Sequence, residues 1–165
     1  MIILGIDPGY DRLGIAVIEF SNGKSSFIYS ACFETDKKSP LTARLFAVGK
    51  EVERSIKKYK PTLLAIETLF FTNNQKTAMG VAEARGVICY EASRAGVTIV
   101  EMTPLQIKQA VTGFGRADKS AVFDMTKRLI RIPVRKMLDD EMDALAVAIA
   151  GSAYGVRGNT IAKKA

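Results

Sequence analysis

The order of the apolar segments constrains the fold of this chain more than any other feature of its sequence. Ile2–Asp7, residues 13–20 and residues 26–34 have the composition of β-strands, and Ser21-Asn22-Gly23 is typical of a hairpin turn between the last two. Helical and strand-like segments then alternate, and three helices follow, which gives the order βββαβαβααα. This order predicts an α/β fold with a five-stranded mixed sheet and helices on both faces.

Capping and turn residues set the boundaries of the later elements. Residues 40–59 carry apolar positions at helical spacing, and Lys60-Pro61 ends that helix. Strands are expected at 62–66 and 97–100, and helices at 77–95, 103–111, 119–130 and 140–154. Residues 1–154 are expected to form one domain, because no linker or repeat divides them, and residues 155–165 to form a flexible tail.

Several functional classes are excluded by composition. The chain has 165 residues and no histidine, so a Ser-His-Asp mechanism and zinc sites that need imidazole are ruled out. Cys32 and Cys89 are too few for a disulfide framework, and we expect buried free thiols. No apolar run reaches the roughly 18 residues of a membrane span, and no signal peptide is recognisable, so we expect a cytoplasmic protein.

Charge is distributed unevenly along the chain. The net charge is +7, and residues 108–136 hold 8 basic and 2 acidic side chains. Residues 137–150 hold 4 acidic side chains and no basic one. A basic segment beside a short acidic cluster is typical of a protein that binds a polyanion and holds a cation. A solvated basic helix is the alternative explanation.

Carboxylates follow two of the expected strands and begin the last helix. Asp7 and Glu67 each end a run of apolar residues, and Asp140 and Asp143 lie three residues apart, on one helical face. Each acid also has an explanation without a shared site. Asp7 could form a turn, Glu67 could lie at the surface, and the helix dipole favours acids in the first turn of the last helix. If all four converge, their repulsion requires a cation, and oxygen ligands favour Mg²⁺ or Mn²⁺. Two such ions about 4 Å apart can activate water and stabilise the leaving oxygen in phosphodiester hydrolysis.

Six short segments of the sequence match the motifs of a known protein family. They are Leu4-Gly5-Ile6-Asp7-Pro8-Gly9, Ala65-Ile66-Glu67 followed by Phe70, Glu83-Ala84-Arg85-Gly86-Val87, Ile107-Lys108-Gln109 with Val111 and residues 113–115, Asp118-Lys119-Ser120, and Asp140-x-x-Asp143-Ala144-Leu145-Ala146. With them, residues 2–154 resemble the RuvC family of Holliday-junction resolvases, which has an RNase H-like fold. The resemblance implies a homodimer that nicks two opposed strands of a four-way DNA junction.

The resemblance also implies roles for individual residues. Asp7, Glu67, Asp140 and Asp143 would be the acidic tetrad that holds two Mg²⁺ ions per subunit. Asp139 is the alternative third ligand, although the spacing to Asp143 favours Asp140. Lys108 and Lys119 would hold the scissile phosphate or offset charge in the transition state.

Further expectations concern contacts with DNA and with partner proteins. Phe70 would insert at the junction crossover, with Phe71 as the alternative, and Arg116 would contact the DNA backbone. The helix at 77–95 is a candidate dimer surface, and Arg135 belongs to a diffuse basic face. The RuvA–RuvB branch-migration complex is an expected partner, and a phage-type protein that acts alone is the alternative.

Two other functional classes were considered. The motif Ile-Asp-x-Gly also occurs near the start of nucleotide-binding proteins of the actin and sugar-kinase type. These proteins need two such domains to enclose the nucleotide, and the length of this chain fits one domain. A non-catalytic junction-binding module is the other alternative, and the intact set of acids argues against it.

Overall fold

The computed structural model describes residues 1–69 and 75–162, and within them the expected order of elements is confirmed. The strands are β1 (Ile2–Asp7), β2 (Arg12–Ser21), β3 (Lys24–Glu34), β4 (Leu63–Glu67) and β5 (Thr98–Met102). The helices are α1 (Leu41–Tyr59), α2 (Gln75–Arg94), α3 (Pro104–Thr112), α4 (Lys119–Leu129) and α5 (Asp139–Ala162).

The five strands form one mixed sheet, as predicted, and their order within it is β3-β2-β1-β4-β5. β1, β2 and β3 are antiparallel neighbours, whereas β4 runs parallel to both β1 and β5. Ile6 on β1 lies opposite Ile66 on β4. Because the two strands are parallel and in this register, Asp7 and Glu67 follow at the same edge of the sheet.

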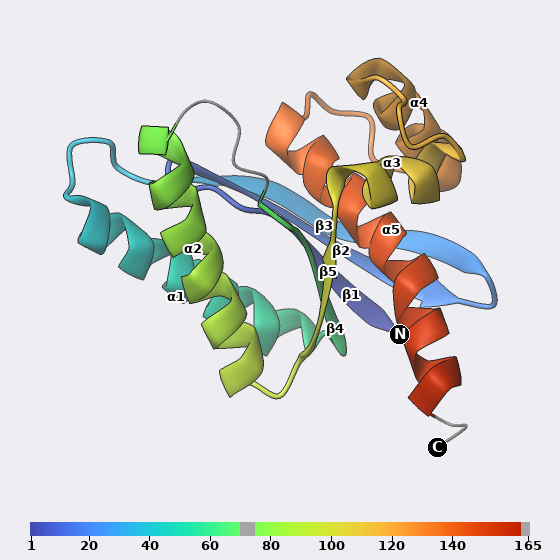
Figure 1. Cartoon of the computed structure of the whole chain (residues 1–165), viewed down its shortest axis with the longest axis horizontal. Coiled ribbons are helices and arrows are strands. Elements are labelled where there is room, and N and C mark those ends of the chain that lie inside the picture. Colours follow the sequence, from blue (N-terminus) through green and yellow to red (C-terminus); the bar gives the residue numbers. More distant parts are fainter. Residues whose placement is uncertain (70–74, 163–165) are drawn as a thin grey trace.

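Helices cover both faces of the sheet, each over its own apolar core. Figure 1 shows α1 and α2 on one side of the strands and α3, α4 and α5 on the other. Leu4, Ile6 and Ile66 face α1 and α2, while Ile3 and Ala65 belong to the core under α5. This alternation follows from the period of two along a strand, which sends successive side chains to opposite faces.

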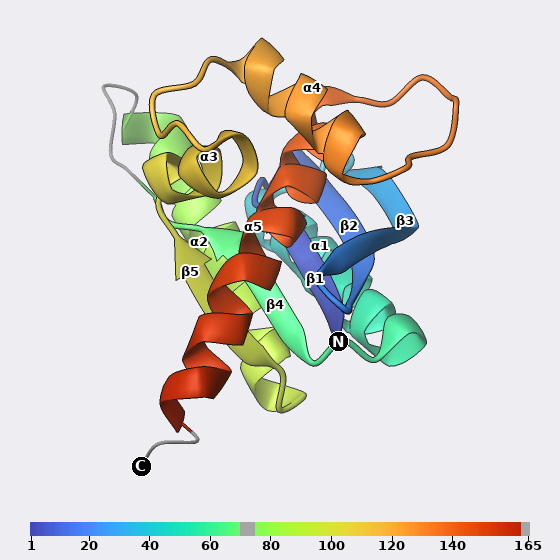
Figure 2. The same cartoon turned by 90° about the vertical axis from the view of Figure 1, so that its right-hand side faces the viewer.

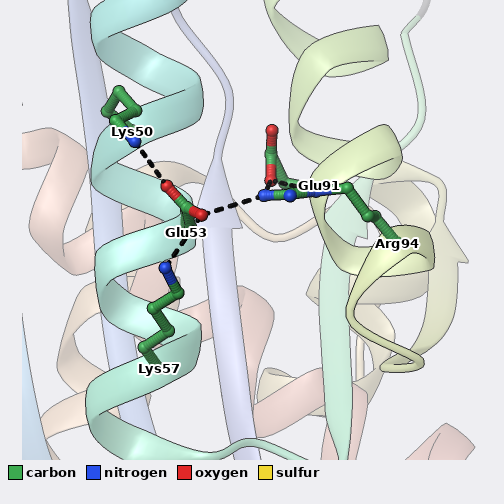
Figure 3. A network of polar contacts seen from close by, with 5 residues as sticks. All are labelled: Lys50, Glu53, Lys57, Glu91 and Arg94. Carbon is green, nitrogen blue, oxygen red and sulfur yellow. Dashed lines mark hydrogen bonds and ion pairs between the residues drawn. The ribbon is translucent and has the colours of Figure 1, made fainter.

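An ion-pair network joins α1 to α2 on the face away from α5 (Figure 3). The Glu53 carboxylate accepts hydrogen bonds from Lys50 at 2.8 Å, Lys57 at 3.0 Å and Arg94 at 3.0 Å. Arg94 also pairs with Glu91 on its own helix. The hydrogen bonds from Lys50, Lys57 and Arg94 lower the pKa of Glu53 to about 2. These contacts fix how the two helices pack on each other.

Two strand glycines allow α5 to lie unusually close to the sheet. A Cβ atom on Gly5 would come within 2.4 Å of the Ala144 carbonyl oxygen, and one on Gly14 within 2.1 Å of the Asp140 carbonyl oxygen. Such distances are far inside van der Waals contact, so any side chain at either position would push the helix away. The first turns of α5 therefore rest directly on β1 and β2, next to Asp7.

Helix α5 is longer than predicted, since it begins at Asp139 and continues to Ala162 instead of ending at Tyr154. The expected break at Gly155 does not occur, because this glycine lies inside the helix against Leu63, where a Cβ atom would come within 2.6 Å of Leu63 Cδ1. Glycine here serves close packing and not termination. Flexibility of residues 155–165 stays a prediction.

Most other helix boundaries lie where the capping and turn residues of the sequence predict them. Thr103 and Gln106 form the expected capping box at the start of α3, and Asp118 caps α4 by accepting a hydrogen bond from Ala121 N. Gly96 follows α2 with a φ of 71°, which favours glycine. Cys32 and Cys89 are free but half-buried, not buried as expected. No helix in residues 1–69 and 75–162 combines the length and the hydropathy needed to cross a membrane.

Candidate active site

The acidic residues predicted to act together meet at one end of the parallel strands. Asp7 and Glu67 are the last residues of β1 and β4, and Asp143 projects from the second turn of α5 toward them. They share a pocket of about 270 Å³ with two lysines and an apolar wall, lined by Asp7, Glu67, Asp143, Lys108, Lys119, Pro104, Ile107, Val122, Ala146 and Val147. Figure 2 shows α3, α4 and the start of α5 gathered at this end of the sheet.

The environment of Asp7 strongly disfavours its charge. Burial, together with the negative charges of Asp143, Glu67 and Asp140, raises the pKa of Asp7 from 3.8 to about 7, although Lys119 works in the opposite direction. An ordinary turn aspartate would keep a pKa near its usual value. Burial is the largest cause of this rise, and the contributions of Asp143, Glu67 and Asp140 indicate that these carboxylates lie close enough to Asp7 to act on it.

Glu67 and Asp143 show the same effect, moderated by the lysines. Burial and the charge of Asp143 raise the pKa of Glu67, and Lys108 lowers it. Burial also raises the pKa of Asp143, against the attraction of Lys119. Lys119 Nζ lies 3.0 Å from Asp143 Oδ2 and 3.3 Å from Asp139 Oδ2.

Asp140 lies beside the pocket and does not line it. Its side chain is 16% exposed, and its Oδ2 atom is 3.2 Å from Arg12 Nη2. This geometry does not make a hydrogen bond, so the buried oxygen has no hydrogen-bond partner among the described residues. Asp139, by contrast, has a side chain that is 70% exposed. Of the two, Asp140 is the residue whose charge raises the pKa of Asp7.

The chemistry of these donors fits a hard divalent cation. Among residues 1–69 and 75–162, no three acidic or cysteine side chains form a ready-made metal cage. Instead, Lys119 pairs with Asp143 and Arg12 approaches Asp140. The Arg12 side chain is 46% exposed and makes no hydrogen bond to Asp140 Oδ2, and burial together with the neighbouring carboxylates raises the pKa of Asp7, so the site retains negative charge that a cation would balance.

The residues predicted to contact DNA are only partly brought together. Lys108 and Lys119 line the pocket, from α3 and α4. Arg116 is exposed on the loop between these helices and does not line the pocket. Phe70 and Phe71 lie outside the described residues.

One predicted contact residue also has a role within the fold. Arg135, assigned to a diffuse basic face, donates a hydrogen bond from Nη2 to Glu141 Oε2 at 2.6 Å, and Ser30 Oγ donates to the same oxygen at 2.9 Å. Burial opposes the ionisation of Glu141, but these hydrogen bonds outweigh it and lower the pKa of Glu141. A charge count could not show that Arg135 also reaches a buried acid near the start of α5, and its place in a diffuse basic face stays a prediction.

Side-chain contacts that the sequence did not predict hold the turn after Asp7 in place. Arg44 on α1 is buried, pairs with Asp11 and donates hydrogen bonds to Thr35 Oγ1 at 2.9 Å and to the Tyr10 carbonyl oxygen at 3.2 Å. Its guanidinium carbon also lies 4.9 Å from the centroid of the Tyr10 ring. No signal in the sequence distinguishes Arg44 from the other basic residues of its amphipathic helix.

Comparisons with known proteins agree with this site. Residues 3–151 match the family described as "Crossover junction endodeoxyribonuclease RuvC". Two relatives have that name. The one from Caldanaerobacter subterraneus is 44% identical, and the alignment spans 90% of this chain and 90% of the relative. The one from Thermosipho melanesiensis is 45% identical, and the alignment spans 90% of this chain and 94% of the relative.

Solved structures show the same fold. The structure of T. thermophilus RuvC in complex with a Holliday junction substrate aligns with a TM-score of 0.89 at 28% identity, over 96% of both chains. The yeast mitochondrial resolvase Ydc2, at 11% identity and a TM-score of 0.69, covers 94% of this chain and 79% of its own and supports the RNase H-like fold alone. From the family match and the two bacterial relatives, we conclude that the chain belongs to the RuvC family of crossover junction endodeoxyribonucleases.

Proposed function

We propose that this chain resolves four-way DNA junctions by hydrolysing one phosphodiester in each of two opposed strands. The observation that carries the proposal is the pocket in which Asp7, Glu67 and Asp143 face Lys108 and Lys119, in a member of this family. The T. thermophilus relative was solved in complex with a Holliday junction substrate. Because the DNA of bacteria lies in the cytoplasm, we place the protein there.

The carboxylates of Asp7, Glu67, Asp140 and Asp143 would hold two Mg²⁺ ions, and Mn²⁺ would substitute. Such ions supply Lewis-acid stabilisation of the leaving oxygen and a water of lowered pKa. Support for this ligand set comes from Asp140 Oδ2, which accepts no hydrogen bond from the described residues, and from Asp7, whose pKa is raised by burial and by the charges of Asp143, Glu67 and Asp140. Asp140 is preferred to the exposed Asp139 because its charge acts on Asp7.

The two lysines of the pocket complement the charge of the DNA. Lys108 lies near Glu67, and Lys119 is held by Asp143, so each ammonium group is already oriented at the wall of the pocket. Positive charge fixed where a phosphate gains negative charge stabilises the transition state without reorganisation. With no histidine in the chain, the carboxylates orient the attacking water.

Paired nicking requires two active sites, and we therefore propose a homodimer. Two subunits related by a twofold axis would present identical pockets to the two opposed strands of a junction. The RuvA–RuvB branch-migration complex stays a predicted partner. Either Phe70 or Phe71 stays the predicted wedge at the crossover.

The test is a nicking assay on an immobile four-way junction, with linear duplex as the control substrate and Mg²⁺ or Mn²⁺ varied. We expect Asp7→Asn to abolish nicking and to keep junction binding. The matched control is Glu19→Gln, because Glu19 is exposed at the other end of β2, opposite Ile2, and should retain full activity. Equal activity of Asp7→Asn and wild type would refute the catalytic assignment. Binding without any nicking by wild type would instead identify a junction-binding module.

A further inference from the structure

The loop between α3 and α4 displays an exposed aromatic side chain beside the pocket. Phe114 is 60% exposed, and its neighbour Arg116 is also exposed. Leu105, which is 58% exposed, packs against the same loop, since a Cβ atom on Gly115 would come within 2.9 Å of Leu105 Cγ. A single exposed apolar residue needs no functional explanation. The explanation for this loop rests on its rigidity, its position and its charge.

The loop is held in place by a set of internal hydrogen bonds. The Gln109 side chain donates to the Gly113 carbonyl oxygen at 2.6 Å and accepts from Gly115 N at 2.9 Å. Phe114 N donates to Thr112 Oγ1 at 3.0 Å, and Gly113 adopts a φ of 78°. A loop that is braced by one amide from both sides presents Phe114 at a defined place, so little conformational entropy is lost when the ring binds a partner.

The helices on both sides of the loop each contribute a residue to the pocket. Lys108 precedes it on α3, Lys119 follows it on α4, and both line the pocket. Arg116 is three residues before Lys119, so the two Cα atoms are at most about 11 Å apart. At the 3.4 Å axial spacing of a duplex strand, the smallest spacing that applies to an unpaired one, this backbone separation corresponds to about three nucleotides.

The segment that carries Phe114 is rich in basic residues. Residues 108–119 contain three basic side chains, Lys108, Arg116 and Lys119, and one acidic side chain, Asp118. The Asp118 carboxylate accepts the hydrogen bond from Ala121 N that caps α4, so it is engaged by the protein. An exposed aromatic ring on a segment that also carries basic side chains is a combination by which proteins bind unpaired bases and their phosphates.

We propose that Phe114 stacks on an unpaired base within about three nucleotides of the scissile phosphate, while Arg116 holds a backbone phosphate of the same strand. This inference rests on the proposed function, because it takes the strand in the pocket to be the strand that is cut. Phe114 belongs to a different segment from the wedge expected at Phe70 or Phe71. Stacking tolerates any base, so this contact positions the strand and does not read its sequence.

The experiment pairs Phe114→Ala with abasic substitutions in an immobile junction. Each nucleotide within three positions of the nicking site is replaced in turn by an abasic site, and nicking rates are measured with Mg²⁺. Wild type should lose about five- to hundredfold in rate at one position, the loss expected from one base–aromatic contact. Phe114→Ala should be slower by a similar factor on the intact junction and should be insensitive to the abasic site at that position. Phe114→Tyr should restore both rate and sensitivity.

A matched control is provided by Phe46, which is 69% exposed on α1, on the other face of the sheet. Phe46→Ala should behave as wild type with every junction, and both alanine variants should keep the wild-type melting temperature. The inference is overturned if Phe114→Ala nicks at the wild-type rate or keeps the wild-type response to abasic sites. If wild type nicks no junction at all, the proposed function itself fails.

Arg116 is tested by the salt dependence of binding. Arg116→Gln should reduce the slope of log affinity against log salt by about one, the change expected when one phosphate contact is lost. An unchanged slope would show that Arg116 holds no phosphate. The same measurement on Phe114→Ala should leave the slope unchanged, because a stacked ring releases no counterions.

Discussion

At the scale of single residues, the ionisation of Asp7 links stability to function. The pKa of Asp7 in the folded, metal-free protein is about 7, against 3.8 for an unperturbed aspartate. The folded state therefore holds this proton more tightly than the unfolded state does. Below about pH 4 both states are protonated, and the carboxyl costs nothing. As pH rises from about 4 to about 7, only the unfolded state ionises freely, so the free energy of unfolding falls.

This linkage predicts the thermal behaviour of Asp7→Asn. Without divalent metal at pH 8, the variant should melt a few degrees above wild type, because the amide removes a charge that is disfavoured by burial and repelled by Asp143, Glu67 and Asp140. At pH 4 the two proteins should melt together. Mg²⁺ should stabilise wild type more than the variant. Thermal melts at both pH values, with and without Mg²⁺, measure these differences, and a wild type that is the more stable protein at pH 8 would contradict the prediction.

At the scale of elements, local signals in the sequence predicted which segments form helices and strands. The capping box at Thr103 and the turn at Asn22-Gly23 depend on neighbours in the chain, so the sequence shows them directly. The contacts of α5 depend on distant partners. Nothing near Gly14 indicates that a helix more than a hundred residues later rests on it, and nothing near Gly155 indicates that Leu63 occupies the space of a side chain.

The start of α5 is held by Glu141, and the structure predicts the cost of removing it. Glu141 is 5% exposed and bonds to Arg135 and Ser30, on two other segments of the chain. Glu141→Ala leaves these partners unsatisfied, and we expect a loss of about 2 kcal/mol in the free energy of unfolding, since Arg135 is partly exposed. The Mg²⁺ concentration for half-maximal nicking should rise, because Asp140 and Asp143 lie on the same turns.

Urea denaturation and a Mg²⁺ titration of nicking measure the two effects separately. Glu141→Gln, which keeps the shape and one acceptor oxygen, should lose less on both counts. Glu34→Ala is the matched control, because Glu34 is exposed at the end of β3. If Glu141→Ala unfolds at the same urea concentration as wild type, the Arg135–Glu141–Ser30 cluster does not hold the helix.

At the scale of the whole molecule, topology explains why the site forms where it does. Parallel pairing of β1 and β4 brings Asp7 and Glu67 to one edge, and the crossing of α5 over β1 and β2 adds Asp143. The sequence therefore predicted the shared site and its carboxylates through the order of elements and the family motifs. It could not predict that Arg12 and Lys119 pair with these acids, because side-chain reach across elements depends on their packing.

The two faces of the sheet carry different features. The α1–α2 face carries the ion-pair network around Glu53 (Figure 3), whereas α3, α4 and α5 surround the acidic pocket. One pocket per chain can cut one strand, so symmetric resolution depends on two chains acting within the lifetime of one complex. The homodimer is thus the part of the account on which paired nicking depends.

Cleavage of a supercoiled plasmid that extrudes a cruciform distinguishes paired nicking by a homodimer from independent nicking by single chains. Paired nicks across the junction convert the plasmid to the linear form, whereas independent single nicks give the open circle. With Mg²⁺, wild-type protein should produce linear plasmid from the start of the reaction, and a plasmid without the cruciform should stay intact. Open circles as the main first product, or equal cleavage of the plasmid without a cruciform, would contradict the account.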